Sequence, residues 1–151
     1  DLMIWLFGPV DKVFASTAKR ALKFKTGDVV TASLQHSSGL NSQITAILKT
    51  PHYQRVTIWG ESGWVELVDS SHPDTPGPSF MKIVMNDGMV KEENFEWTDT
   101  VSANIHNFID SIQGQSKYLF TDVEKFQNIS VLEAIYKSSL SKQNEKVESF
   151  D

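Results

Sequence analysis

From residue 10 to residue 97 apolar and polar residues alternate, and beyond Trp97 the spacing of the apolar residues becomes helical. The alternation is clearest at residues 30–35, 44–49 and 55–59. Alternation with a period of two is typical of strands in a sheet that is buried on one face. Strands and helices that occupy separate parts of a chain predict an α+β fold rather than repeated βαβ units.

Further strands are predicted at residues 10–18, 64–68, 80–86 and 89–96. Turn-forming sequences separate them, namely Ser38-Gly39, Gly60-Glu61-Ser62-Gly63 and Asn86-Asp87-Gly88. Residues 70–79 hold three of the five prolines and are expected to form an exposed loop. Because the connections are short, we expect an open, predominantly antiparallel sheet of about six strands with helices packed on one face.

Three segments have helical character. Residues 1–7 are almost all apolar and lead into Gly8, which is expected to close a helix. Apolar residues follow one helical face from Val101 to Ile112, with Gly114 as the terminating glycine. Thr121 and Glu124 form a capping box for a helix that ends near Ser141. The tail, residues 143–151, is expected to fray or to form a last edge strand.

A helix as short as the first one is marginal alone, because nucleation is costly. We therefore expect residues 1–8 to be the end of a truncated helix and residues 9–151 to form one domain. A chain of 151 residues with 40% hydrophobic residues can bury a core of ordinary size.

Charge and composition exclude several classes of function. The net charge of −5 disfavours nucleic-acid binding, which needs clustered cations. No basic amphipathic stretch or long apolar run suggests a membrane. The absence of cysteine excludes disulfides, thiolate nucleophiles and zinc sites with cysteine ligands. A cytoplasmic protein is expected.

Residues that often carry chemistry are scattered. The histidines, His36, His52, His72 and His106, lack the close spacing of a metal pair. We expect loop or strand-end positions for the first three and a position beside the apolar stripe of its helix for His106. Ser62 lies in a hairpin turn rather than in the strand-to-helix turn of a nucleophile elbow.

Two further signals are weak. The glycosylation sequon at Asn128-Ile129-Ser130 lies inside a predicted helix, where a chance match is favoured. The large aromatics Trp5, Trp59, Trp64 and Trp97 could line a ligand pocket, but core positions are favoured. With no carboxylate pair to act as acid and base, the sequence predicts a fold without a complete active site, as in one part of a larger enzyme.

Four segments, taken in order, resemble the C-terminal domain of the Gfo/Idh/MocA oxidoreductases, the family of glucose–fructose oxidoreductase and inositol dehydrogenase. The first is DLMIWLFGPV at residues 1–10, followed by Val13 and Ala15. The others are IWGESGWVE at residues 58–66, NFIDSIQG at 107–114 and VLEAIYKSS at 131–139. The resemblance covers nearly the whole chain and rests on the order and spacing of the four segments.

The resemblance implies a parent enzyme that transfers hydride between NAD or NADP and a sugar, polyol or related hydroxy compound. A missing Rossmann domain would hold the cofactor, and a lysine, an aspartate and a histidine upstream of Asp1 would carry the catalysis. The chain itself is then expected to hold no catalytic, cofactor or metal site and to be inactive. Asp1 matches the last motif position and is the one candidate substrate-binding residue, although at a free chain end we favour a disordered residue.

The resemblance also implies a homodimer formed through the open face of the sheet, which would explain the Thr, Ser and Gln residues on that face. The small-molecule substrate would be the other partner, with no role for nucleic acid or membrane. The alternative is a free-standing, non-catalytic ligand-binding or scaffolding module with a pocket between sheet and helices.

Overall fold

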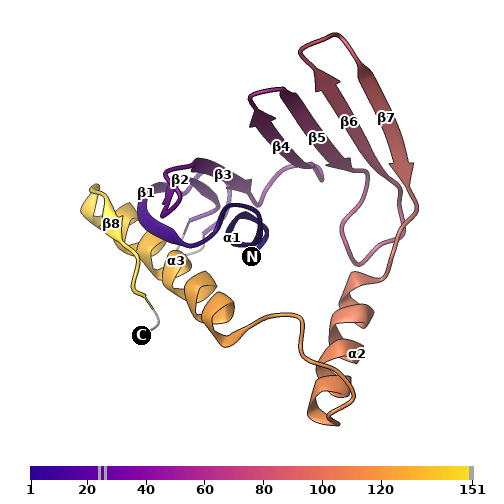
Figure 1. The fold of residues 1–151 in the computed structure, drawn as a ribbon. Helices are drawn as coiled ribbons and strands as arrows, with labels where there is room; N and C mark the ends of the chain where they lie inside the picture. Colours follow the sequence, from indigo (N-terminus) through magenta and orange to yellow (C-terminus); the bar gives the residue numbers. More distant parts are fainter. Residues whose placement is uncertain (24, 26, 150–151) are drawn as a thin grey trace. The chain divides into compact units, whose positions relative to one another are not determined.

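The computed structural model describes residues 1–23, 25 and 27–149, which form three helices and eight strands (Figure 1). The helices are α1 (Leu2–Phe7), α2 (Thr100–Ile112) and α3 (Asp122–Ser141). The strands are β1 (Val10–Ala18), β2 (Val29–His36), β3 (Asn41–Ile47), β4 (Gln54–Gly60), β5 (Gly63–Asp69), β6 (Ser79–Met85), β7 (Val90–Phe95) and β8 (Glu145–Lys146). The predicted α+β class is confirmed.

The strands form two four-stranded antiparallel sheets, with the orders β3-β2-β1-β8 and β4-β5-β6-β7. The prediction of one sheet of about six strands is therefore wrong. Alternation defines the two faces of a strand but not which edges pair. Between β3 and β4 the chain passes through Pro51, which has no amide to donate to a ladder. The chain accordingly divides into two compact units, Asp1–Lys49 with Phe120–Asp151, and Thr50–Leu119.

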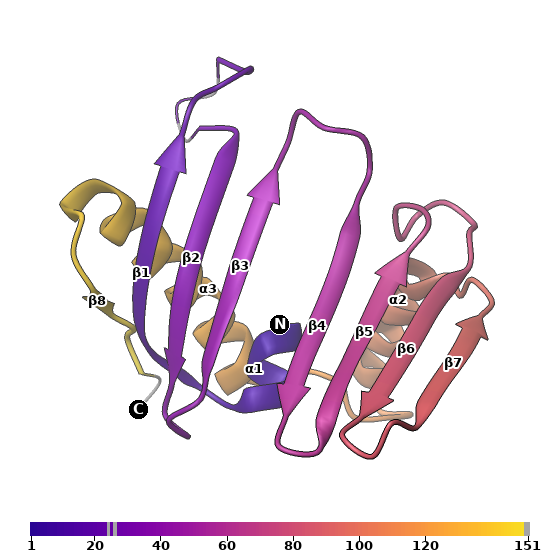
Figure 2. The same cartoon turned by 90° about the horizontal axis from the view of Figure 1, so that it is seen from above.

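The core of the described chain lies in the first of these units, between α3 and the strands β1 and β2. Figure 2 shows α3 running behind this sheet. The side chains that β1 and β2 direct toward α3 follow the predicted alternation. The buried hydrophobic residues are Ile4, Val10, Val13, Ala15, Ala32, Leu34, Val131, Ala134 and Val147. The short strand β8 pairs with the free edge of β1, as the prediction of a last edge strand allowed.

The second unit is fully described and contains no buried residue. The large apolar side chains of α2 are all well exposed. Their exposed fraction is lowest at Ile109, with 43%, and highest at Ile112, with 69%. The prediction of helices packed on one face thus holds for α3 but not for α2. The prediction of core tryptophans is also wrong, because Trp5 and Trp59 are 72% and 75% exposed and no tryptophan is buried. A helical stripe predicts an apolar face without specifying what covers it.

Most of the predicted turns and caps are confirmed. Gly8 closes α1 with a φ of 82°, and its amide donates to the Ile4 carbonyl. Gly114, with a φ of 72°, follows the C-cap Gln113 of α2 in a Schellman arrangement, in which the Gln115 amide donates to the Asp110 carbonyl. Thr121 and Glu124 make both bonds of the capping box. The sequence therefore predicts the ends of the elements better than their partners.

Candidate functional site

The predicted substrate-binding residue, Asp1, is exposed at the start of α1. Its ammonium group donates a hydrogen bond to Oδ1 of Asn128 on α3 at 3.1 Å, and its carbonyl accepts from the Trp5 amide at 2.9 Å. The Asp1 side chain makes no capping bond to the helix. Its carboxylate is thus open to solvent, and its role in substrate binding stays a prediction.

The other end of α1 is held by the hairpin between β2 and β3. The carbonyls at a helix end have no hydrogen-bond donor within the helix. At the end of α1 three residues of the hairpin donate to the carbonyls of residues 7–9. Nδ1 of His36 lies 2.8 Å from the Gly8 carbonyl oxygen, which accepts its hydrogen, and the Ser38 hydroxyl donates to the carbonyl of Phe7 at 3.1 Å. The Ser37 amide donates to the Pro9 carbonyl at 2.9 Å. These bonds fix the direction of α1 on the first sheet.

His36 is the one buried histidine in the described part of the chain, with 1% of its surface exposed. Its Nε2 accepts from the Ser42 hydroxyl at 2.8 Å, and its ring meets the edge of Phe7 at a centroid distance of 5.6 Å. The prediction of a strand-end position is confirmed, but the burial was missed. The sequence pattern predicts this burial, because His36 lies two residues after Leu34 and four after Ala32, on the same face of β2 as these two buried residues. With both nitrogens bonded, the ring cannot also act as a metal ligand or a base.

The remaining histidines are exposed, as expected. Nδ1 of His72 lies 2.6 Å from Oδ1 of Asp74, and this bond, with help from Thr75, lowers the pKa of the Asp74 carboxyl. The ring of His52 lies 6.2 Å from that of His72. His106 bonds the Ser102 carbonyl within its own helix. Within the described ranges no three His, Asp or Glu side chains are grouped to hold a metal ion.

The two other motifs lie where the sequence predicted. Ser62 is in the turn of the hairpin formed by β4 and β5, whose closing pair is Gly60 and Gly63. This turn joins two strands and so lacks the strand-to-helix geometry of a nucleophile elbow. Asn128 lies inside α3 and accepts the bond from Asp1. Neither motif contributes catalytic geometry.

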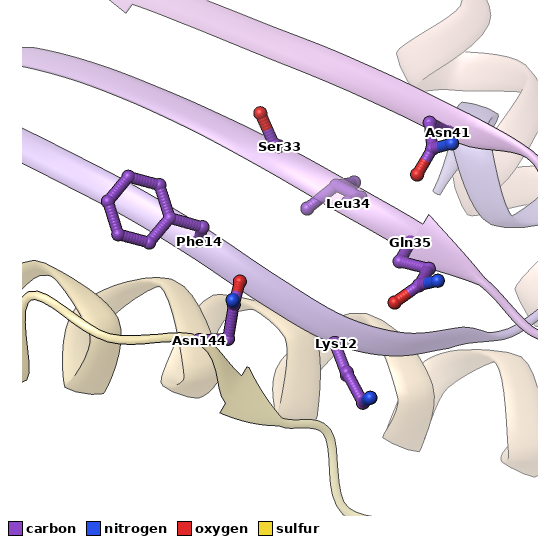
Figure 3. Close-up of a pocket in the computed structure, with 7 residues that line it drawn as sticks. All are labelled: Lys12, Phe14, Ser33, Leu34, Gln35, Asn41 and Asn144. Atoms are coloured by element: carbon purple, nitrogen blue, oxygen red, sulfur yellow. The ribbon is translucent and has the colours of Figure 1, made fainter.

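The outer face of the first sheet carries a shallow hollow of about 290 Å³ on the side away from α3 (Figure 3). Its polar lining consists of amide, hydroxyl and ammonium groups with the ring of Phe14 beside them. The lining residues are Lys12, Phe14, Ser33, Leu34, Gln35, Asn41 and Asn144. Such groups can bond a neutral, hydroxylated ligand but include no general base. Because they come from four separate segments, no local sequence pattern predicts the hollow.

A larger hollow of about 670 Å³ lies beside β8 in the same unit, lined by Pro9, Val10, Asp11, Ser37, Gln127, Lys146, Val147, Glu148 and Ser149. Gln127, which is buried, donates from its side-chain amide to the Val10 carbonyl at 3.2 Å, so this amide joins α3 to β1. The charged lining groups are one ammonium and two carboxylates on exposed chain. No catalytic arrangement follows from them.

None of the helices in the described ranges is both long and apolar enough to cross a membrane.

Residues 1–148 match the sequence model of a protein family, that of the GFO/IDH/MocA oxidoreductases. The family is described as "Oxidoreductase family, C-terminal alpha/beta domain". The chain belongs to this family. This Gfo/Idh/MocA C-terminal domain has no match among curated proteins.

Solved structures with the same fold are described as oxidoreductases or dehydrogenases. An NADPH-dependent oxidoreductase from Desulfitobacterium hafniense is 16% identical with a TM-score of 0.79, and covers 95% of this chain and 44% of its own. The WlbA dehydrogenase from Bordetella pertussis, solved with NADH and UDP-GlcNAcA, is 23% identical with a TM-score of 0.69, covering 99% and 42%. An Agrobacterium radiobacter oxidoreductase, solved with NAD+, L-tartaric acid and magnesium, is 16% identical with a TM-score of 0.73, covering 97% and 46%. The Gfo/Idh/MocA domain thus spans less than half of each of these chains.

Proposed function

We propose that this chain is the substrate-side and oligomerisation domain of an NAD(P)-dependent oxidoreductase that acts on a sugar, a polyol or a related hydroxy compound. The observation that carries the proposal is the family match over residues 1–148, on a chain that spans 42–46% of the three relatives described above. In this proposal the cofactor and the catalytic residues belong to the other half of the parent enzyme. The domain alone neither binds nicotinamide nor turns over substrate.

The relatives support the class of substrate. The Bordetella relative was solved with a nucleotide sugar and the Agrobacterium relative with L-tartaric acid. Both ligands carry secondary alcohols, in which the carbon gives up hydride and the hydroxyl gives up a proton when the oxidised nicotinamide is reduced. The carboxylate of Asp1, exposed at the start of α1, can accept hydrogen bonds from such hydroxyls.

The test is an activity assay on the complete polypeptide encoded with this domain. Reduction of NAD+ and NADP+ is followed by absorbance with a panel of polyols, hexoses, nucleotide sugars and hydroxy acids. We expect activity with at least one of these classes, and an Asp1→Asn variant with a raised KM. The matched control is Asp110→Asn, on α2, which should keep the KM of the parent.

A complete polypeptide that neither binds NAD(H) nor reduces it with any member of the panel contradicts the proposal. That result favours the second candidate, a non-catalytic ligand-binding module. The observation in favour of this candidate is the hollow of Figure 3, whose amides and Phe14 ring suit a neutral polar ligand without a general base.

We also propose that the domain forms a homodimer through the outer face of β1, β2 and β3. Lys12 is the one charged residue among the exposed residues of this face. The uncharged ones are Phe14, Ser16, Thr31, Ser33, Gln35, Asn41, Gln43 and Thr45. A solvated sheet face usually carries Lys and Glu, whereas charged residues are depleted at the centre of protein interfaces. A second copy of the same face fits this composition.

Light scattering coupled to size exclusion tests the homodimer. We expect twice the mass of the monomer for the wild type and a monomer for Ser33→Arg, which places a charge in the middle of the face. Ser116→Arg, at an exposed position outside this unit, should stay dimeric. A wild type that remains monomeric at high concentration, or equal dissociation by both variants, contradicts the dimer without affecting the assignment of the enzyme.

A further inference from the structure

The loop between β1 and β2 is strongly cationic in a chain that is acidic overall. Residues 19–25 hold four of the 14 Lys and Arg, namely Lys19, Arg20, Lys23 and Lys25. All four are exposed. The remaining ten cations are spread over a chain that carries 18 of its 19 carboxylates outside residues 19–28. The loop is therefore a local concentration of positive charge in an acidic chain.

These cations are not neutralised within the described part of the chain. The ion pairs present there use Arg55, Lys82, Lys91, Lys125, Lys137 and His72. The one carboxylate inside the loop, that of Asp28, is turned toward the backbone rather than toward the cations. The four side chains are thus available for an external anion.

Asp28 orders the backbone at Arg20 and at the two residues that follow it. Its carboxylate accepts three successive amides, from Arg20 at 2.7 Å, Ala21 at 2.6 Å and Leu22 at 2.7 Å. Successive amides that converge in this way form an anion-binding nest, and here the chain fills the nest itself. These bonds, the Arg20 amide first, lower the pKa of the Asp28 carboxyl, so that it stays ionised at neutral pH.

The base of the loop is fixed as well. The Asp28 amide donates to the Ala18 carbonyl at 2.9 Å, and the Leu48 amide donates to the Asp28 carbonyl at 2.9 Å. Gly27 has a φ of 92°, and a Cβ at this position would lie 2.7 Å from the Ala18 carbonyl oxygen. Only glycine permits this close approach. The ordered base lowers the entropy lost when the loop binds a ligand.

We propose that four described side chains between β1 and β2, those of Lys19, Arg20, Lys23 and Lys25, bind a small ligand bearing a diphosphate. Guanidinium and ammonium groups are the side chains that bind phosphate oxygens most strongly. Cations at successive and alternate positions can reach two adjoining phosphates. The site does not depend on the oxidoreductase assignment, because it is built from residues of this chain alone.

A compact diphosphate fits the loop better than an extended polyanion. Nucleic acid and anionic membranes need a basic surface that continues over a stripe or a plane. Beyond the loop, this chain carries 18 carboxylates against ten cations, which would repel the neighbouring phosphates of such a partner. Two phosphates can be neutralised by the loop without extending past it.

The test is a titration of the 151-residue chain with sodium pyrophosphate, followed by amide chemical shifts in 50 mM and 300 mM salt. We expect saturable shifts concentrated in residues 19–28 and weaker binding at the higher salt concentration. Arg20→Gln with Lys23→Gln should weaken binding about tenfold, which is in the range of two lost charge-assisted contacts. Lys19→Gln with Lys25→Gln provides a second pair.

Lys117→Gln with Lys146→Gln is the matched control, since it removes two exposed cations outside the loop, and it should keep the affinity within about twofold. Shift dispersion outside the loop reports whether each variant is folded. Absence of saturable shifts, or equal weakening by the control pair, overturns the site. Binding of a single-stranded RNA or of phosphatidylserine vesicles that pyrophosphate fails to displace overturns the assignment of a small ligand.

Discussion

His36 and Gly8, 28 positions apart in the sequence, are joined by a hydrogen bond of 2.8 Å between imidazole Nδ1 and the carbonyl oxygen that ends α1. The opposite ring nitrogen is bonded to Ser42, so that the ring connects α1 to both strands of the β2–β3 hairpin. The entry of the chain into the first sheet is therefore fixed by one side chain. His36 is therefore a buried residue whose two ring nitrogens are both used by the fold.

Replacing His36 with alanine should lower the free energy of unfolding by about 2 kcal/mol, because it leaves the partly buried Gly8 carbonyl and the buried Ser42 hydroxyl without their partner. Urea unfolding followed by circular dichroism measures the loss. His106→Ala, at an exposed position on α2, should change stability by less than about 0.5 kcal/mol. Equal effects of the two substitutions would mean that the bonds of His36 contribute nothing to the fold.

Gly63→Ala should disrupt the pairing of β5 with β6. A Cβ at this position would lie 2.2 Å from the Val84 carbonyl oxygen, so the strands must separate, at a cost of about 2 kcal/mol. Gly60→Ala, the other end of the same turn, is the control, because its Cβ would meet the nearest atom at 3.6 Å. Hydrogen exchange of the β5 and β6 amides distinguishes the variants. Unchanged protection in Gly63→Ala would be inconsistent with the described register.

Ser138 connects α3, β1 and the tail. Its hydroxyl accepts from the Ala15 amide at 2.8 Å and donates to the Gln143 carbonyl at 2.6 Å, and the residue has no exposed surface. Ser138→Ala should therefore cost about 2 kcal/mol in urea unfolding, since both backbone groups lose their partner. Ser116→Ala, on an exposed connection, should be close to neutral. A neutral Ser138→Ala would show that water replaces the hydroxyl at no cost.

The stabilising effect of Asp28 should depend on pH. The amides of Arg20 and Ala21 hold the pKa of its carboxyl below the ordinary value, so the folded pKa lies below that of the unfolded chain. The stabilisation is then complete above about pH 4, near the unfolded pKa, and is lost as the pH falls through the folded pKa.

Urea midpoints of the wild type and of Asp28→Asn, measured between pH 2.5 and pH 7, test this dependence. We expect the wild type to be more stable at pH 7 and the difference to shrink below pH 4. Glu96→Gln, at an exposed carboxylate, is the control and should show little difference at either end. A gap between wild type and Asp28→Asn that stays constant down to pH 2.5 would exclude the ionised carboxylate as its source.

The parts of the fold that the sequence predicts are those determined by near neighbours. The alternation of Ala32 and Leu34, the glycine at position 114 and the capping box at Thr121 each report on a few adjacent residues. The pairing of sheet edges depends on contacts between distant segments, so the break between β3 and β4 was missed. The same reason explains α2, whose apolar face was predicted but whose exposure was not.

The candidate site follows the same division. The resemblance pointed to Asp1. The histidines lie where they were expected, with His36 at a strand end, His52 and His72 in loops, and His106 within α2 beside its apolar stripe. The burial of His36 could have been predicted from its phase with Leu34, but its bond to Gly8 could not. The hollow beside Phe14 is assembled from four segments, and no pattern along the chain reports such an assembly.

The most direct test of the assignment to one half of an oxidoreductase is the intact mass of the native polypeptide that contains this domain. The three relatives described above match this chain over 42–46% of their length, so we expect a mass roughly twice the 17.0 kDa of the 151 residues. A native polypeptide of 17.0 kDa would contradict the assignment and would establish a free-standing module instead.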